Sequence, residues 1–274
     1  MPGLFTAALA QYRESGYFAP VRALPPAAAA ALRARLEAYE AAEPELRRRL
    51  RNKLHLVFTW LDSLIRDPGI LGPVQSILGP NVLCWGSGFF IKEAHDRSFV
   101  SWHQDSTYWG LDPADIVTAW VAFSDSTESN GAMRVIPGSH RSEQLAHRDT
   151  FAEGNLLSRG QEVAVAVDER QAVALELQPG EMSLHHVRLI HGSEPNPSDR
   201  RRIGFAIRYL PTHVRQTAAT HDSATLVCGE DQFHNFVPEQ RPDADLSPAA
   251  LAFHAKITGE QNAILLRGAR PGSM

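Results

Sequence analysis

Residues 181–211 read EMSLHHVRLIHGSEPNPSDRRRIGFAIRYLP, which is two short apolar runs separated by a segment rich in Pro, Asn, Ser and Asp. Apolar runs of this length, bounded by turn residues, are typical of β-strands. The same texture extends over residues 81–211, where further turn signals are Asn130-Gly131, Pro137-Gly138 and Pro179-Gly180. Many short strands with such punctuation predict an antiparallel sandwich or barrel of the jelly-roll kind.

Helical regions are expected on both sides of this strand-rich part. Residues 1 to about 75 are expected to be helical, because Pro25-Pro26 opens an Ala- and Arg-rich run with high helix propensity. A short helix is expected from Asp67 to Leu78, where apolar residues recur at helical spacing. Residues 247–274 predict a final helix and a tail.

We expect one domain over residues 1–274, with an all-β core and flanking helices (an α+β class). A mainly helical flank (1–78) precedes a jelly-roll core (79–212), and strands, loops and a helix follow (213–274). Residues 141–171 interrupt the strands of the core and predict a long insertion. Long loops in compact domains often act as lids or binding loops.

The composition is that of an ordinary globular protein. Apolar residues make up 43% and charged residues 21% of the 274 residues, and the net charge is -4. This charge balance gives no reason to expect a nucleic-acid partner, and no apolar run reaches the roughly 18 residues of a membrane span. Cys84 and Cys228 lack the spacing of a disulfide framework, and the N-terminus lacks the order of a signal peptide, so a cytoplasmic location is expected.

The most informative motif is Trp102-His103-Gln104-Asp105. A β-strand directs residues i and i+2 to the same face, so His103 and Asp105 can meet one metal ion. His191, which ends an apolar run and precedes Gly192, is the candidate third ligand. Two imidazoles and one carboxylate on one side of an iron leave positions open for a keto acid and dioxygen, as in the facial triad of non-haem Fe(II) oxygenases.

Other interpretations of these residues stay open. With 12 histidines in the chain, an H-x-D motif alone is weak evidence for a metal site. His185 and His186 are expected to form hydrogen bonds within their sheet, although His185 shares strand parity with His191 and is the alternative third ligand. Two histidines and an aspartate also hold zinc in hydrolases. A barrel that has lost its activity and persists as a binding module is a further alternative.

Arg202 is the candidate cation for a co-substrate. The alternation of RIGFAIR over residues 202–208 places Arg202, Arg208 and the small residues between them on one strand face, and bulky apolar residues on the other. The small residues leave room for a ligand. Because 2-oxoglutarate binds iron through its keto acid end, its distal carboxylate needs a separate partner, and the planar fork of arginine suits it. Arg200 and Arg201 are expected to form a solvated turn.

Over most of residues 85–210, these motifs resemble the phytanoyl-CoA dioxygenase family of Fe(II)- and 2-oxoglutarate-dependent oxygenases. The motifs are Trp102-His103-Gln104-Asp105, Asn130-Gly131 leading to Ile136-Pro137-Gly138-Ser139-His140, Pro179-Gly180-Glu181, and His191-Gly192-Ser193 followed by Asn196-Pro197-Ser198 and Arg202. The resemblance implies a double-stranded β-helix (cupin-like jelly roll), with the metal held by His103, Asp105 and His191. It also implies that Arg202 binds the distal carboxylate.

The resemblance assigns further residues around the co-substrate. Trp120 is expected to form a wall of its pocket, and Gln104, Lys92 and Ser193 are candidates for contacts with 2-oxoglutarate. His140 is expected to fix its loop. Trp102, Phe89 and Phe90 are expected to serve packing.

The implied activity requires Fe(II), 2-oxoglutarate and dioxygen, and releases succinate and carbon dioxide while an unactivated C–H bond is oxidised. Halogenating relatives have a small residue in place of the carboxylate ligand. Because Asp105 is present, hydroxylation is expected rather than halogenation.

The primary substrate is expected to be a small polar metabolite. This hypothesis rests on five side chains that together would offer positive charge to an acidic substrate: His140, His147, Arg148, Arg159 and Arg208. The expected partners are therefore small molecules, with neither nucleic acid nor membrane, and the oligomeric state is left open.

Overall fold

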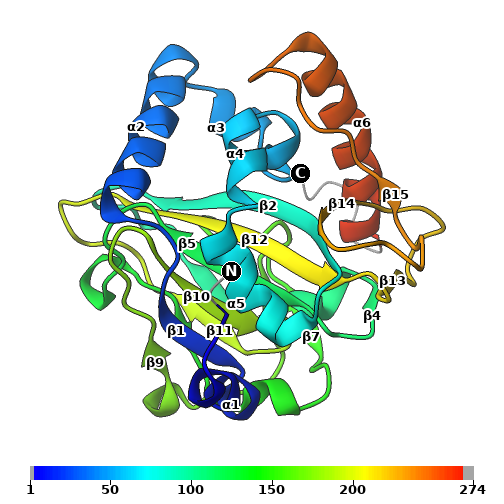
Figure 1. Ribbon diagram of the computed structural model, residues 1–274. Coiled ribbons are helices and arrows are strands. Elements are labelled where there is room, and N and C mark those ends of the chain that lie inside the picture. Colours follow the sequence, from blue (N-terminus) through cyan, green and yellow to red (C-terminus); the bar gives the residue numbers. More distant parts are fainter. Residues whose placement is uncertain (1–2, 268–274) are drawn as a thin grey trace.

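The structure is a computed structural model that describes residues 3–267, in which two β-sheets face each other and helices cover the larger one (Figure 1). The larger sheet has seven strands, in the order β1 (Tyr17–Arg22), β10 (Glu181–His186), β5 (Val117–Ala122), β12 (Arg202–Pro211), β2 (Val82–Lys92), β14 (Ser223–Cys228) and β15 (Val237–Pro238). The smaller sheet has four strands, in the order β3 (Val100–His103), β11 (His191–Ser193), β6 (Arg134–Val135) and β9 (Val173–Ala174). The predicted all-β core of the jelly-roll kind, with flanking helices, is confirmed.

Four helices gather on the outer face of the larger sheet. They are α2 (Pro26–Ala42), α3 (Leu46–Arg49), α4 (Thr59–Leu64) and α6 (Pro248–Leu265), and Figure 1 shows them together above the sheet, with the smaller sheet below. Two further helices are α1 (Thr6–Ser15) and α5 (Pro68–Leu78), and α5 also packs against β5 and β12. None of the helices in residues 3–267 combines the length and hydrophobicity that crossing a bilayer requires.

The main hydrophobic core lies between these helices and the larger sheet. Leu61 and Ile65, at α4, and Ile70, in α5, pack there with Phe205 and Ile207 of β12. The predicted alternation of β12 is therefore confirmed, because its bulky residues point outward to the helices and leave the opposite face to line a pocket. One strand thus links the stability of the core to the geometry of the site.

The predicted helices around Asp67 and after residue 247 are confirmed as α5 and α6. The Asp67 side chain accepts a hydrogen bond from the Gly69 amide at 2.8 Å, and Ser247 caps α6 in the same way. The Ala-rich run forms α2, which ends at Ala42, two residues before Pro44. The tail predicted after α6 runs into residues 268–274, which lie outside the described residues.

The region before residue 75, which was expected to be mainly helical, also contains one strand, β1. Gly16 ends α1 in the left-handed conformation (φ +80°), and Tyr17–Arg22 then pairs with β10 at the edge of the larger sheet. The register shifts between Phe18 and Val21, at Pro20, because proline cannot donate a ladder hydrogen bond and is confined to edges and bulges. Tyr17–Arg22 therefore forms a strand because it pairs with the edge of β10, and local helix propensity does not set its structure.

The remaining segments are short. The segment 141–171 contains β7 (His147–Asp149) and β8 (Gln161–Val163), which pair with each other, and β8 packs against β3. In the C-terminal region β13 (Arg215–Gln216) pairs with β4 (Leu111–Asp112). Arg201, expected in a solvated turn, is largely buried and pairs with Glu40 of α2 at 2.7 Å, which ties that helix to the end of the core. Arg200 is exposed and pairs with Asp125. The division of the chain into flank, core and insertion stays a prediction.

Candidate metal centre

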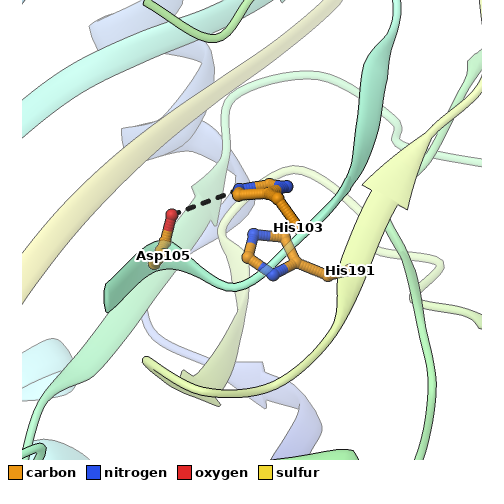
Figure 2. A group of neighbouring side chains, drawn as sticks. All are labelled: His103, Asp105 and His191. Carbon is orange, nitrogen blue, oxygen red and sulfur yellow. Dashed lines mark hydrogen bonds and ion pairs between the residues drawn. The ribbon is translucent and has the colours of Figure 1, made fainter. Parts of the chain in front are cut away.

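His103, Asp105 and His191 form a compact cluster at the end of the smaller sheet. His103 ends β3, His191 begins β11, and the two residues are directly paired in the antiparallel ladder. Asp105 begins the 3₁₀ turn η2 (Asp105–Tyr108). The candidate ligand atoms of the three lie within 4.8 Å of one another, and Figure 2 shows the side chains converging from the two strands and the turn.

The predicted route by which His103 and Asp105 meet is wrong in one respect. We expected residues i and i+2 on one face of a continuous strand, but β3 ends at His103 and Asp105 lies in the following turn. The turn brings Oδ1 of Asp105 to 3.3 Å from Nε2 of His103. The pair is therefore held by the end of a strand and a helical turn together.

Backbone carbonyls select the tautomer of both histidines. Nδ1 of His103 lies 2.9 Å from the carbonyl oxygen of Ser101, and Nδ1 of His191 lies 2.9 Å from that of Leu189. Because a carbonyl can only accept, each Nδ1 carries the proton and each Nε2 keeps its lone pair. The bare Nε2 of His103 then faces a carboxylate oxygen, so a cation is required between them, either a second proton or a metal ion. This donor set fits Fe(II).

The surrounding charges favour the protonation states that metal binding needs. Burial raises the pKa of Asp105, but the hydrogen bond with His103 and the positive charges of His191, His103 and Arg208 outweigh it and hold that pKa well below its ordinary value. Burial, reinforced by His103, holds the pKa of His191 well below its ordinary value. An ionised carboxylate and a neutral imidazole are the forms that bind divalent metals.

The cluster lines one side of a pocket of about 440 Å³. The opposite side is the inner face of the larger sheet, which contributes Trp120 from β5 and Arg202, Ala206 and Arg208 from β12. The pocket therefore brings the candidate ligands and both arginines of β12 into one space.

Arg202 is a buried cation without an acidic partner. Its side chain is 2% exposed, one guanidinium nitrogen donates to the carbonyl of Gly131, and Nε has no partner. No acidic side chain of residues 3–267 forms an ion pair with it, and the guanidinium carbon lies 5.4 Å from the centre of the Trp120 ring. Burial lowers the pKa of Arg202 to about 10, so the group is still charged at neutral pH. A buried unpaired cation in a pocket indicates an anionic ligand.

The small residues between the two arginines were expected to leave room for a ligand, but one of them makes room for Trp120 instead. At Gly204 the free space is taken by Trp120, because a β-carbon there would lie 1.8 Å from Cζ2 of the indole. Trp120 thereby lies across β12 beside Arg202 and forms part of the pocket wall. Only Ala206 leaves open space between the arginines on this face.

The three further candidates for co-substrate contacts differ in position. Ser193 lines the pocket, and its hydroxyl accepts a hydrogen bond from Nζ of Lys92 at 2.7 Å. Lys92 also donates to the carbonyl of Glu194 and therefore lies behind Ser193. Gln104 points away, since its amide donates to Arg188 and accepts from Leu145 and Gln144. Gln104 ties the segment after residue 141 to the turn that carries Asp105.

His185 and Phe90 also line the pocket. Nε2 of His185 lies 3.9 Å from Oδ2 of Asp105, and the His185 ring centre lies 4.8 Å from that of His191, but His185 is outside the group of three candidate ligands. Its expected hydrogen bond within the sheet is absent at Nδ1, which is buried without a partner. Phe90, expected to serve packing, faces the pocket, whereas Phe89 lies against the core.

Four of the five positive charges expected to attract the substrate are occupied elsewhere. Arg148 pairs with Glu162, Arg159 with Asp149, and His147 bonds to backbone and hydroxyl groups beside Gln104. His140 holds its loop to the carbonyl of Arg13, as expected. Only Arg208 faces the pocket, because the charges of the 141–171 segment pair mainly within that segment.

Sequence reasoning missed Thr118 and Met133, which also line the pocket. Thr118 had a usable signal, since it lies two residues before Trp120 in the same strand and therefore shares its face. Met133 had none, because it lies in a connection just before β6.

Comparisons with known proteins agree with this geometry. A sequence model of the phytanoyl-CoA dioxygenase family matches residues 12–204. The chain is 34% identical over 169 residues to a probable alpha-ketoglutarate-dependent hypophosphite dioxygenase of Stutzerimonas stutzeri, an alignment covering 60% of this chain and 57% of that protein. Overall, the chain spans about half the length of the curated relatives it matches.

Two solved structures of the non-haem monooxygenase ThoJ are similar over nearly their whole length. The apo form is 37% identical with a TM-score of 0.83, covering 95% of this chain and 98% of that one. The nickel complex is 34% identical with a TM-score of 0.80, covering 95% and 99%. The resemblance inferred from the four motifs is confirmed, and the chain belongs to the phytanoyl-CoA dioxygenase family.

Proposed function

We propose that this protein is an Fe(II)- and 2-oxoglutarate-dependent oxygenase that hydroxylates an unactivated C–H bond of a small polar metabolite. The observation that carries the proposal is the pairing, in one pocket, of the His103, Asp105 and His191 cluster with the unpaired cation Arg202. The cluster alone would suit several metals, and the arginine alone would suit any anion. Their combination matches a co-substrate that chelates a metal at one end and carries a carboxylate at the other.

His103, Asp105 and His191 are the proposed iron ligands. His103 and His191 each offer Nε2, because their Nδ1 protons are engaged by backbone carbonyls. Three protein ligands on one side leave coordination positions open on the other. His185 is proposed to stay outside the coordination sphere, because it does not belong to the group of three candidate ligands.

Arg202 is proposed to bind the distal carboxylate of 2-oxoglutarate, with Trp120 as the adjoining wall and Ser193 beside it. Nε of Arg202 is the donor without a partner, and Lys92 holds the Ser193 hydroxyl in place from behind. A hydrogen bond from a charged donor in a water-poor pocket is stronger than one at the surface. Arg202 therefore positions the co-substrate, and it has no part in bond making.

When bound, Fe(II) and 2-oxoglutarate supply the oxidising chemistry, in which dioxygen gives one oxygen atom to succinate and one to the hydroxylated product, with release of carbon dioxide. The protein's own groups bind and orient the reactants and exclude water from the apolar wall formed by Trp120 and Phe90. Asp105 occupies the position that must be vacant for a halide, which supports hydroxylation over halogenation. The dioxygenase and monooxygenase named among the relatives support an oxygen-dependent reaction.

A small-molecule substrate is proposed, in line with the hypophosphite dioxygenase named among the relatives. A cytoplasmic location is also proposed, and the two free cysteines, Cys84 and Cys228, support a reducing compartment.

The test is anaerobic addition of Fe(II) and 2-oxoglutarate to metal-free protein, watching for the visible charge-transfer band of the chelate. We expect the band in the wild type, its loss in Asp105→Ala, and a shift to roughly tenfold or more higher 2-oxoglutarate concentration in Arg202→Ala. Arg200→Ala is the matched control, since Arg200 is an exposed neighbour paired with Asp125.

Each contrary result has a distinct meaning. A wild type that binds a divalent metal but shows no band contradicts the oxygenase assignment and favours a zinc hydrolase or a non-catalytic module. A band that forms equally well in Arg202→Ala contradicts the role of Arg202 alone.

A further inference from the structure

A row of polar side chains crosses the inner face of the larger sheet beside the metal-binding cluster. His185 of β10 is paired with Thr118 of β5, and Thr118 is paired in turn with Arg208 of β12. Directly paired residues on one face have β-carbons about 4.5–5.5 Å apart. All three line the pocket. These residues are therefore lateral neighbours, although they come from distant parts of the sequence.

The row contains hydrogen-bonding groups without partners. Oγ1 of Thr118 and Nδ1 of His185 are buried, and neither has a hydrogen-bond partner among residues 3–267. Buried polar atoms are nearly always hydrogen-bonded in native proteins, so two orphans on adjacent strands indicate a missing ligand. Ser183, two residues before His185 in β10 and paired with Trp120 of β5, adds a third unpartnered group, a hydroxyl.

Arg208 supplies the charge of the row. Its guanidinium lies 5.7 Å from the ring centres of both Phe90 and Trp109, and it forms neither an ion pair nor a side-chain hydrogen bond with any residue in the described range 3–267. Gly86, its partner on β2, has no side chain, and a β-carbon there would approach Cδ of Arg208 at 3.5 Å. That distance is an ordinary van der Waals contact, and the guanidinium lies beside two aromatic rings.

The row is separate from the cation proposed for 2-oxoglutarate. Arg202 and Arg208 are six residues apart on one extended strand, so their backbones lie about 20 Å apart. Trp120 and Gly204 occupy the Arg202 half of this face. At the other half, Asp105 approaches His185 at 3.9 Å. A ligand bound to the row would therefore lie near Arg208 and Asp105, away from Arg202.

We propose that Arg208, Thr118 and His185 form the binding site for an oxyanion group of the primary substrate, so that the substrate is a small carboxylate or phosphonate. This inference rests on the proposed oxygenase function and adds the substrate class to it. Arg208 supplies the charge and two parallel N–H donors, Thr118 supplies a hydroxyl donor, and His185 supplies an N–H from the adjacent strand. An anion held there would lie beside the metal-binding cluster, because Nε2 of His185 is 3.9 Å from Oδ2 of Asp105.

The test measures binding of three probes to the full chain loaded anaerobically with Fe(II) and saturating 2-oxoglutarate. Propionate and methylphosphonate carry the two kinds of oxyanion, and propionamide is the neutral match of propionate. Titration calorimetry gives the affinities, while the charge-transfer band shows that 2-oxoglutarate stays bound. We expect at least one anion to bind roughly tenfold or more tightly than propionamide, and the preferred anion identifies the oxyanion.

The variants are Arg208→Met, Thr118→Val and the control Arg148→Met, an exposed arginine paired with Glu162. Arg208→Met should weaken anion binding roughly tenfold or more and abolish the preference over propionamide, with the band retained. Thr118→Val keeps the shape of the side chain and should weaken the anion several-fold, which preserves the test if Arg208→Met does not fold.

Two results overturn the inference, each with the band present. They are anions that bind the wild type no better than propionamide, and an Arg208→Met or Thr118→Val variant that binds anions like the wild type. A wild type without the band contradicts the proposed function instead, and the assignment of this row to a substrate fails with it.

Discussion

Trp120 lies against the backbone of Gly204, so closely that a β-carbon at Gly204 would be 1.8 Å from Cζ2 of the indole ring. The two residues belong to neighbouring strands of the larger sheet, β5 and β12, and the ring lies beside the buried guanidinium of Arg202. The absence of a side chain at Gly204 therefore allows the Trp120 ring to form this part of the pocket wall.

Gly204→Ala should displace Trp120 and destabilise the protein by about 1–3 kcal/mol, the usual cost of overpacking. It should also weaken 2-oxoglutarate binding, because the displaced ring moves against Arg202. Denaturant unfolding and the 2-oxoglutarate dependence of the charge-transfer band measure the two effects. Gly259→Ala is the control, since nothing lies within 4 Å of a β-carbon there and α6 should gain about 0.5–1 kcal/mol. Equal behaviour of the two variants would contradict the steric argument.

The choice of His191 over His185 as third metal ligand can be measured directly. His191→Ala should lower Ni(II) or Fe(II) affinity by more than about tenfold and remove most of the rise in melting temperature that metal binding produces. His185→Ala should keep metal affinity within a few-fold of the wild type, because His185 lies outside the group of three ligand atoms. A larger loss of metal affinity in His185→Ala than in His191→Ala would show that His185 is the third ligand.

Lys92 should make stability rise with pH on the alkaline side. Burial, and then the charge of Arg202, lower the pKa of Lys92 to about 7, against an ordinary value of 10.5. Between these two values the unfolded chain binds more protons than the folded one, so the free energy of unfolding increases as pH rises from 7 toward 10.5.

Lys92→Met should flatten this increase relative to the wild type, whereas Lys256→Met, an exposed lysine of α6, should leave it unchanged. Urea unfolding at pH 7, 8, 9 and 10 provides the measurement. A wild type and a Lys92→Met variant with parallel pH profiles would show that Lys92 titrates alike in both states.

Glu239 should make the free energy of unfolding depend on pH on the acid side. Its buried carboxylate pairs with Nζ of Lys53 at 2.5 Å and lies 3.2 Å from Nε2 of His55. Burial raises the pKa of Glu239, but Lys53 and His55 outweigh it and lower that pKa from 4.5 to about 2. The depressed value means that its stabilisation is complete above pH 4.5 and is lost as pH falls from 4.5 toward 2.

Glu239→Gln should therefore cost about 3–5 kcal/mol at pH 7, because it leaves Lys53 buried without its counter-charge. The difference from the wild type should shrink below pH 4.5, as followed by denaturant unfolding. Glu45→Gln, in an exposed pair with Arg48, is the control and should change little. A pH-independent difference would indicate lost packing instead of lost charge.

Features that depend on residues close together in the chain could be predicted from the sequence. The alternation of Arg202 to Arg208, the helix beginning after Asp67 and the short spacing of His103 and Asp105 are local patterns. Such patterns are set by the two-residue period of a strand and by hydrogen bonds within a few residues. His191 could be added from its motif, although no local rule places it opposite His103.

Features that depend on lateral neighbours in the sheet could not be predicted. The strand order β10-β5-β12 puts Thr118 between His185 and Arg208, and no spacing in the sequence encodes that order. Tyr17–Arg22 is a strand because it pairs with the edge of β10, and Arg148 and Arg159 have acidic partners within the 141–171 segment.

The sequence by itself determined the kind of chemistry that we propose, because the H-x-D motif, the arginine-bearing strand and the family motifs are local or order-dependent signals. Only the tertiary structure decided which cations stay unpaired. Whether an arginine forms an ion pair depends on the side chains that sheet pairing brings together. Within residues 3–267, that pairing left Arg202 and Arg208 without a carboxylate partner in one pocket, while Arg159 and Arg201 are paired with acidic side chains.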